Sequence, residues 1–267
     1  MKKLIRKLAK VFVGGISVAA VTLLIGLYTP TGVKAGEADA RKLLKAMSDF
    51  MVSQKALSFE YDATLEVVTT DQQRLGLASS GSVILNRPDK IRAIRSGGFA
   101  DLEMSFDGKT LTLLGKNLNI YTQLEVPGTI DHLVNELKDT YNRPLPAADL
   151  LLSNSYDEMM LDVVDVKDVG VGVIGGVECD HLAFRTKDVD WQIWIAQGDH
   201  PYPVRYVITS KFIDGGPQYS IQTRNWETGG KVAATDFTFK NPTKADKVEL
   251  KDLPDELPDH FKVGGTK

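Results

Sequence analysis

The stretch "SFEYDATLEV", residues 58–67, alternates polar and apolar side chains. Its apolar members are Phe59, Tyr61, Ala63, Leu65 and Val67. Because successive side chains of a β-strand point to opposite faces, this pattern predicts a strand with one buried face. Residues 36–57, just before it, repeat apolar side chains at helical spacing. An amphipathic helix is therefore expected to lead directly into a long, half-buried strand.

Further strands are expected on both sides of a helical region. In residues 81–96, "GSVILNRPDKIRAIRS", Pro88 predicts a break between two strands, because proline cannot donate to a strand ladder. In residues 101–114, "DLEMSFDGKTLTLL", Asp107-Gly108 predicts a hairpin turn. The other expected strands are 116–126, 163–173, 176–186, 189–196, 203–213, 217–227 and 231–240.

Residues 129–142 and 147–161 have helical spacing instead and interrupt the run of strands. Strands joined by short turns are antiparallel neighbours, and a twisted sheet of about ten strands tends to curl. The sequence therefore predicts an α+β fold, a curved antiparallel β-sheet or half-open barrel with helices packed on its concave face. The inserted helices at 129–161 are expected to act as a lid at the mouth of the interior.

The N-terminal 35 residues have the features of an export signal. Five Lys or Arg residues precede an uncharged apolar run, Val11–Tyr28, and Val33-Lys34-Ala35 is a small-x-small cleavage site. The run is also close to the ~20 residues that span a bilayer, so an uncleaved N-terminal membrane anchor is the alternative. Residues 36–240 are predicted to form a single β domain in the periplasm, and residues 241–267 an irregular, proline-broken tail.

Charge and cysteine content exclude several classes of function and of fold. Residues 1–35 hold six Lys or Arg and no Asp or Glu, so their removal changes the net charge from −3 to −9. An acidic domain disfavours nucleic acid, whose phosphates need clustered Lys and Arg. It also disfavours adsorption to anionic lipid headgroups. With a single cysteine the chain has no internal disulfide, so its stability must come from the core.

Cys179 and His181 are the most conspicuous candidates for chemistry. On a strand they share a face but lie about 7 Å apart, beyond the ~3 Å reach of a thiolate–imidazole pair. The other histidines, at 132, 200 and 260, lack metal-ligand spacing. Nucleophile-elbow, zinc-protease and nucleotide-binding motifs do not occur. The sequence predicts no catalytic residues, no metal and no cofactor.

Apolar strand faces and methionines are the remaining candidates for a binding site. The thioether of methionine adapts to irregular shapes, which suits a flexible acyl chain. For each residue the alternative is ordinary core beneath the helices. The residues predicted to line an apolar cavity are Met47, Met51, Met104, Phe106, Trp191, Ile193, Ile195, Tyr206 and Ile208.

Several segments resemble a family of exported bacterial proteins described as predicted periplasmic proteins of unknown function. They are "NRPDKIRA", "SFDGKTLTLL", "NIYTQLEVPGTID", "GGVECDHLAFRTKDVDWQIWI" and "GDHPYPVRYVITSKF", spread over most of residues 37–240. The succession "RPDKIR … FDGKTL … Y" is also similar to the bacterial outer-membrane lipoprotein carrier and its receptor. That resemblance implies a curved sheet over helices that shelters lipid acyl chains. The chain departs from the receptor in lacking its lipidated cysteine.

Together these observations predict a non-enzymatic periplasmic protein that shelters a hydrophobic ligand, a lipid or an acylated partner. Transient contact with the envelope membrane is a further possible interaction. Burial contributes about 0.8 kcal/mol per methylene, so a dozen carbons suffice to drive binding. The alternative is an envelope scaffold that binds proteins and has no small ligand.

Overall fold

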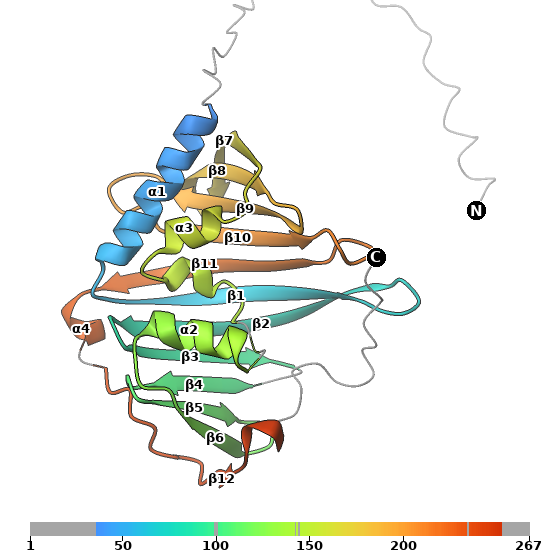
Figure 1. Cartoon of the computed structure of the whole chain (residues 1–267). Coiled ribbons are helices and arrows are strands. Elements are labelled where there is room, and N and C mark those ends of the chain that lie inside the picture. Colours follow the sequence, from blue (N-terminus) through green and yellow to red (C-terminus); the bar gives the residue numbers. More distant parts are fainter. Residues whose placement is uncertain (1–35, 99–100, 142, 144, 234, 253–267) are drawn as a thin grey trace, which may run out of the picture. The chain divides into compact units, whose positions relative to one another are not determined.

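The computed structural model describes residues 36–98, 101–141, 143, 145–233 and 235–252. The predictions for residues 1–35 and for the end of the tail, 253–267, lie outside the described residues. Twelve strands in the described part form one sheet in the order β12-β6-β5-β4-β3-β2-β1-β11-β10-β9-β8-β7 (Figure 1). Their bounds are β1 Ala56–Val68, β2 Arg74–Asn86, β3 Lys90–Gly97, β4 Leu102–Phe106, β5 Thr110–Gly115, β6 Ile120–Glu125, β7 Asp165–Ile174, β8 Val177–Arg185, β9 Val189–Ala196, β10 Pro203–Ser210, β11 Gln218–Thr228 and β12 Asp246–Lys247.

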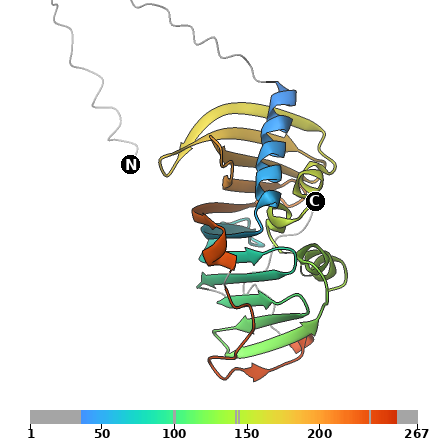
Figure 2. The same ribbon diagram turned by 90° about the vertical axis from the view of Figure 1, so that its left-hand side faces the viewer.

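The helices of the described residues are few and mostly short. They are α1 Glu37–Ser53, α2 Ile130–Asp139, η1 Ala148–Leu151, α3 Ser155–Met160, α4 Gly230–Ala233 and η2 Leu250–Asp252. Figures 1 and 2 show α1, α2 and α3 on the same face of the sheet, with β7 and β8 bending around α1. Within the described residues, no helix combines the length and the hydropathy needed to cross a bilayer.

The sheet is open, with β12 at one edge and β7 at the other. Ten of its eleven strand pairings are antiparallel, and only the short β12 pairs in parallel, with β6. This arrangement confirms the predicted α+β fold, a curved half-open sheet with helices on its concave face.

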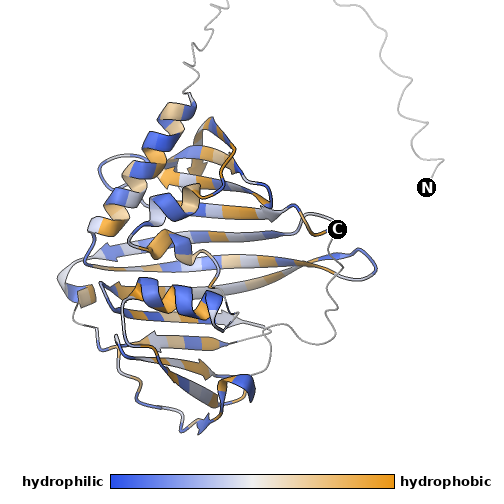
Figure 3. Cartoon of the chain, in the orientation of Figure 1, coloured by the Kyte–Doolittle hydropathy of each residue, from blue (hydrophilic) through white to orange (hydrophobic). Residues whose placement is uncertain are grey.

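Strand β1 shows how the alternating sequence positions the core. Phe59, Tyr61 and Ala63 are buried, whereas Glu60 and Asp62 between them are exposed, as predicted. The pairing of β1 with β2 and β11 extends this order, because partners in register share a face. Figure 3 shows the resulting alternation of hydrophobic and hydrophilic residues along the strands.

The predicted break and hairpin also form where the sequence places them. Strand β2 ends at Asn86 and β3 begins at Lys90, with a cis Arg87–Pro88 bond between them. In the β4–β5 turn, Gly108 has φ +96°, and an added Cβ would lie 2.7 Å from the Asp89 carboxylate. The backbone conformation therefore favours glycine at position 108, and a larger residue would also require the Asp89 side chain to shift.

Two predicted elements are wrong, and the tail predicted to be irregular holds β12 and η2 in its described part, residues 241–252. Residues 147–161 do not form one helix, because the chain divides into η1 and α3, with an extended Leu152 between them. The described residues of 231–240 do not form a strand: α4 occupies residues 231–233, and residues 235–240 are irregular. A strand needs a neighbouring edge with free backbone groups, and no described strand pairs with this segment.

Residues 235–245, which are irregular and precede β12, instead pack on the face of the sheet opposite the helices. Phe237 is buried, the ring of Phe239 lies 5.0 Å from that of Tyr121, and an Arg92 side-chain N–H donates to the Asp236 carbonyl over 2.8 Å. This half of the sheet, β3 to β6, is thus covered on both faces.

Candidate ligand-binding site under the helices

The nine residues predicted to line a cavity all belong to, or pack against, one apolar cluster on the concave face. Eight of them are buried, with exposed fractions of 8% or less, and Ile208 is half-buried. Met47 and Met51 extend from α1 onto the strands, and the other seven stand on strands β4, β9 and β10.

Two groups can be distinguished among the strand residues. Register pairs Tyr206 with Ile193 and Ile208 with Trp191, so β9 and β10 form one continuous apolar surface. Trp191 stacks on Phe184 of β8 at 3.8 Å between ring centres and meets Tyr206 edge-on at 5.7 Å. Met104 and Phe106, on β4, are separated from this surface by strands β3, β2, β1 and β11.

The space that the sequence suggested around these side chains is filled. Met47, Phe106 and Ile193 have no accessible surface at all. A side chain without accessible surface borders no space that admits a water molecule. A ligand can therefore reach these residues only after part of the helical cover has moved.

The cover consists of α1, α2 and residues 145–160, which contain η1 and α3 and are called here the short-helix segment. Its leucines at 150, 151 and 152 and Met159 are buried. Polar contacts tie it to three other elements. The Tyr206 hydroxyl of β10 donates to Asp149 over 2.9 Å, Ser155 and Ser48 of α1 lie 2.5 Å apart between hydroxyl oxygens, and the Ser153 backbone N–H donates to Asp131 of α2 over 3.1 Å.

The Asp149–Tyr206 contact is an ionisable pair inside an apolar region. Burial raises the pKa of Asp149, an effect that the hydrogen bond from Tyr206 partly offsets. Burial raises the pKa of Tyr206 well above its ordinary value, and the nearby carboxylate adds to that shift. Neither residue forms an ion pair with a described Lys, Arg or His, and the only other ionisable group that influences Asp149 is Glu158, another acid.

Arg87 is a second buried polar group near the cover. It lies in the β2–β3 turn, whose Pro88 carbonyl accepts a hydrogen bond from the first residue of α2. Its Nε and Nη2 atoms are buried without a hydrogen-bond partner among the described residues. Burial lowers the pKa of Arg87, and the nearby Asp131 carboxylate opposes this shift.

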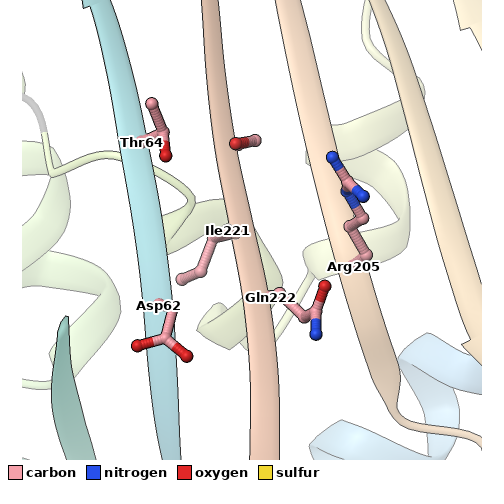
Figure 4. Close-up of a pocket in the computed structure, with 6 residues that line it drawn as sticks. Asp62, Thr64, Arg205, Ile221 and Gln222 are labelled. Carbon is pink, nitrogen blue, oxygen red and sulfur yellow. The ribbon is translucent and has the colours of Figure 1, made fainter. Parts of the chain in front are cut away.

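A shallow hollow of about 220 Å³ lies on the face away from the helices (Figure 4). Polar side chains from β1, β11 and β10 surround it, and the guanidinium of Arg205 lies 5.5 Å from the ring centre of Trp194. Its lining residues are Asp62, Thr64, Arg205, Ser220, Ile221 and Gln222. An open, polar hollow of this size does not suit an acyl chain.

Cys179 and His181 make separate contacts. Cys179 is buried against Ala196 and Val204, its thiol donates to the Val177 carbonyl over 3.4 Å, and burial raises its pKa. His181 stacks on Trp194 at 4.0 Å, with one ring nitrogen 2.9 Å from the Gln192 side-chain oxygen. Among the described residues, no three His, Cys, Asp or Glu side chains are grouped as a metal site would require.

Sequence reasoning missed the polar residues of the cover. Asp149 lies within "AADLLL", residues 147–152, and a lone carboxylate in an apolar run is a signal that could have been noticed. Its partner Tyr206 is 57 residues away, and Ser48 is 107 residues from Ser155. Contacts between residues so distant in sequence depend on the folded sheet.

Several solved structures of bacterial proteins align with about three quarters of this chain. Mycobacterium tuberculosis lipoprotein LppX aligns with 74% of this chain and 100% of its own, at 13% identity and a TM-score of 0.46. LprF from Mycobacterium bovis aligns with 76% and 97%, at 12% identity and 0.39. The LolA superfamily protein NE2245 from Nitrosomonas europaea aligns with 74% and 99%, at 11% identity and 0.33. Likeness at this level transfers no function.

A search of curated proteins finds no match. The match to a sequence family is more extensive, since residues 40–251 fit the profile of DUF2092, described as a predicted periplasmic protein. This span includes the entire sheet, α1 from its fourth residue onward, and the short-helix segment. The chain therefore belongs to the DUF2092 family of predicted periplasmic proteins.

Proposed function

We propose that this protein binds a hydrophobic ligand, a lipid or the acyl chain of a partner, between the concave face of its sheet and the short-helix segment. The observation that carries the proposal is an apolar floor beneath the short-helix segment, which contains no helix longer than six residues. Met47, Met51, Met104, Phe106, Trp191, Ile193, Ile195, Tyr206 and Ile208 are the proposed lining. The family description supports action in the periplasm.

The cost of displacing the short-helix segment is similar to the free energy gained by burying an acyl chain in its place. Four large apolar side chains of the short-helix segment are buried, at about 1.5–3 kcal/mol each, so displacement into water costs about 6–12 kcal/mol. Burial of a twelve-carbon chain returns about 10 kcal/mol at 0.8 kcal/mol per methylene. The closed form is thus the stable one without ligand, and an acyl chain can replace the segment at little net cost.

Locking the cover tests the proposal. The Ser48 and Ser155 hydroxyl oxygens are 2.5 Å apart, and a disulfide places its sulfurs about 2.05 Å apart. Ser48→Cys with Ser155→Cys should therefore join α1 to α3 on oxidation. We expect the wild-type protein to take up the neutral fluorophore 1-N-phenylnaphthylamine, the oxidised double variant to lose uptake, and reduction to restore it.

The matched control is Ser48→Cys alone, treated with the same oxidant. All these proteins retain the free Cys179, so this control shows any effect of the oxidant that does not come from the new disulfide. Equal uptake by the locked and wild-type proteins would contradict a moving short-helix segment. Absence of uptake by the wild type, together with absence of co-purified lipid in native mass spectrometry, would contradict ligand binding.

A protein-interaction scaffold is the second candidate, and the edge strand β7 favours it. Val169, Val171 and Val173 are 53%, 68% and 65% exposed on the last strand of the sheet. Unpaired edge strands recruit other chains. The locked variant separates the two functions, because a scaffold acting through β7 should keep its partners with the cover fixed.

The uncleaved N-terminal anchor and the transient contact with the envelope membrane remain predictions.

A further inference from the structure

The partly buried carboxyl of Asp149 has no ion-pair partner among the described residues. It faces the apolar interior from η1, one of its oxygens accepts a hydrogen bond from Tyr206, and its other ionisable neighbour is the acidic Glu158 on α3. The backbone N–H groups of Leu150 and Asp149 also act on this carboxyl, and its two oxygens offer about four lone-pair sites in all, so acceptor capacity remains. In an apolar environment such a group favours a donor or a cation and opposes a second negative charge.

The pair lies beside the proposed acyl site. Tyr206 is 4% exposed, pairs in register with Ile193 on one side and Ile221 on the other, and meets the ring of Trp191 edge-on. A ligand tail along Trp191 and Ile193 would bring its polar end to the Tyr206 hydroxyl and the Asp149 carboxyl. Movement of the short-helix segment would separate these two partners and expose both to that polar end.

We propose that Asp149 and Tyr206 form a headgroup subsite that accepts amphiphiles with a hydrogen-bond-donating neutral or cationic end, an alcohol or an ammonium group, and rejects carboxylates. This inference rests on the proposed function and adds the chemical class of the ligand. Arg87 is the buried cation that could favour the opposite charge, but the carboxylate that influences it is Asp131, at the start of α2.

The test compares ligands that differ only in the polar end. 1-Dodecanol, dodecylammonium and dodecanoate compete with 1-N-phenylnaphthylamine near neutral pH, each below its micelle concentration. We expect the alcohol and the ammonium to displace the fluorophore from the wild type at concentrations at least about tenfold lower than dodecanoate, because like charges in a desolvated site repel strongly. In Asp149→Asn, this gap should shrink to within about threefold, with dodecanol little changed.

Asp157→Asn is the matched control, because it removes an equal charge from an exposed position on α3 and should leave the preference intact. Circular dichroism and melting curves of both variants check that they fold. If the wild type binds dodecanoate as tightly as dodecanol, or more tightly, the proposed subsite is wrong. Tighter binding of dodecanoate would indicate that the Arg87 guanidinium binds the polar end instead. A preference for the alcohol that survives Asp149→Asn would also overturn it. Failure of the fluorophore to bind any folded variant would instead contradict the proposed function itself.

Discussion

Helix α1 and the short-helix segment cover the same face of the sheet but are held there by different interactions. Over its 17 residues α1 buries Ala40, Leu44, Met47 and Met51, all at helical spacing and each no more than 1% exposed. The short-helix segment has helices of four and six residues, too short to be stable alone, and combines buried leucines with polar contacts to β10, α1 and α2.

These different interactions determine which part of the cover can move. An apolar stripe on a long helix has no favourable alternative to the core, so α1 should leave the sheet only on global unfolding. A hydrogen bond contributes only about 1 kcal/mol net, since water or a ligand can replace its partner. The short-helix segment can therefore open locally while α1 stays in place. Three measurements test this difference between the two parts of the cover, from the largest expected effect to the smallest.

Met47→Ala should have the largest effect. Met47 has no accessible surface, and removing a buried side chain of this size costs about 2–5 kcal/mol of the free energy of unfolding. Lys42→Ala, at an exposed position of the same helix, should change it by less than about 0.5 kcal/mol. Chemical denaturation gives both values. A small loss at Met47 would mean that α1 is not the fixed part of the cover.

Tyr206→Phe should have a smaller and more local effect. It leaves the partly buried Asp149 carboxyl without its side-chain donor, which costs about 1–3 kcal/mol. Hydrogen exchange should accelerate in residues 148–160 and remain unchanged in α1. Tyr121→Phe is the control, because the Tyr121 hydroxyl makes no hydrogen bond with a described residue. Equal acceleration in α1 would show that the two parts of the cover open together.

The pH dependence of stability should show the smallest effect. Burial raises the pKa of Asp149, so the folded state holds this proton more tightly than the unfolded state. The stabilisation is complete below the ordinary aspartate pKa of about 3.9 and is lost as pH rises through the raised value. Tyr206 on β10 and Glu158 on α3 are the ionisable groups that act on Asp149.

Denaturation from about pH 4 to about pH 7 measures this effect, since the group titrates upward from its ordinary value. Asp149→Asn should gain stability relative to the wild type as pH rises. Asp236→Asn is the control and should show no such gain, because hydrogen bonds from Lys240 and Thr238 lower the pKa of the exposed Asp236, so its stabilisation is lost only as pH falls below the ordinary aspartate value. A constant difference between Asp149→Asn and the wild type would argue against a perturbed carboxyl in the cover.

Much of the fold could be predicted because its signals are local. The alternation at Phe59, Tyr61 and Ala63, the break at Pro88 and the turn at Gly108 depend on residues a few positions apart. The same holds for the buried stripe of α1. Residues 147–161 also carry a helical pattern, yet the chain divides there, where Asp149, Ser153 and Ser155 have polar partners on three other elements.

The candidate site was predictable only as a set of apolar residues. Period-two spacing placed Trp191, Ile193 and Ile195 on one face, and the structure confirms their common burial. Spacing carries no information on whether helices fill the space above that face, since this depends on side-chain volumes brought together from distant segments. The strand expected at 231–240 failed for a related reason, because pairing depends on which other strand the folded chain brings alongside a segment.

By itself the sequence determined the hydrophobic period of each segment, and with it the order of helix and strands, which residues face the core and the family to which the chain belongs. Only the tertiary structure decided that the concave face is closed by side chains and that Tyr206 donates to the partly buried Asp149. Periodicity arises from the geometry of a few consecutive residues, whereas filling and pairing arise from residues that the folding of the sheet brings together.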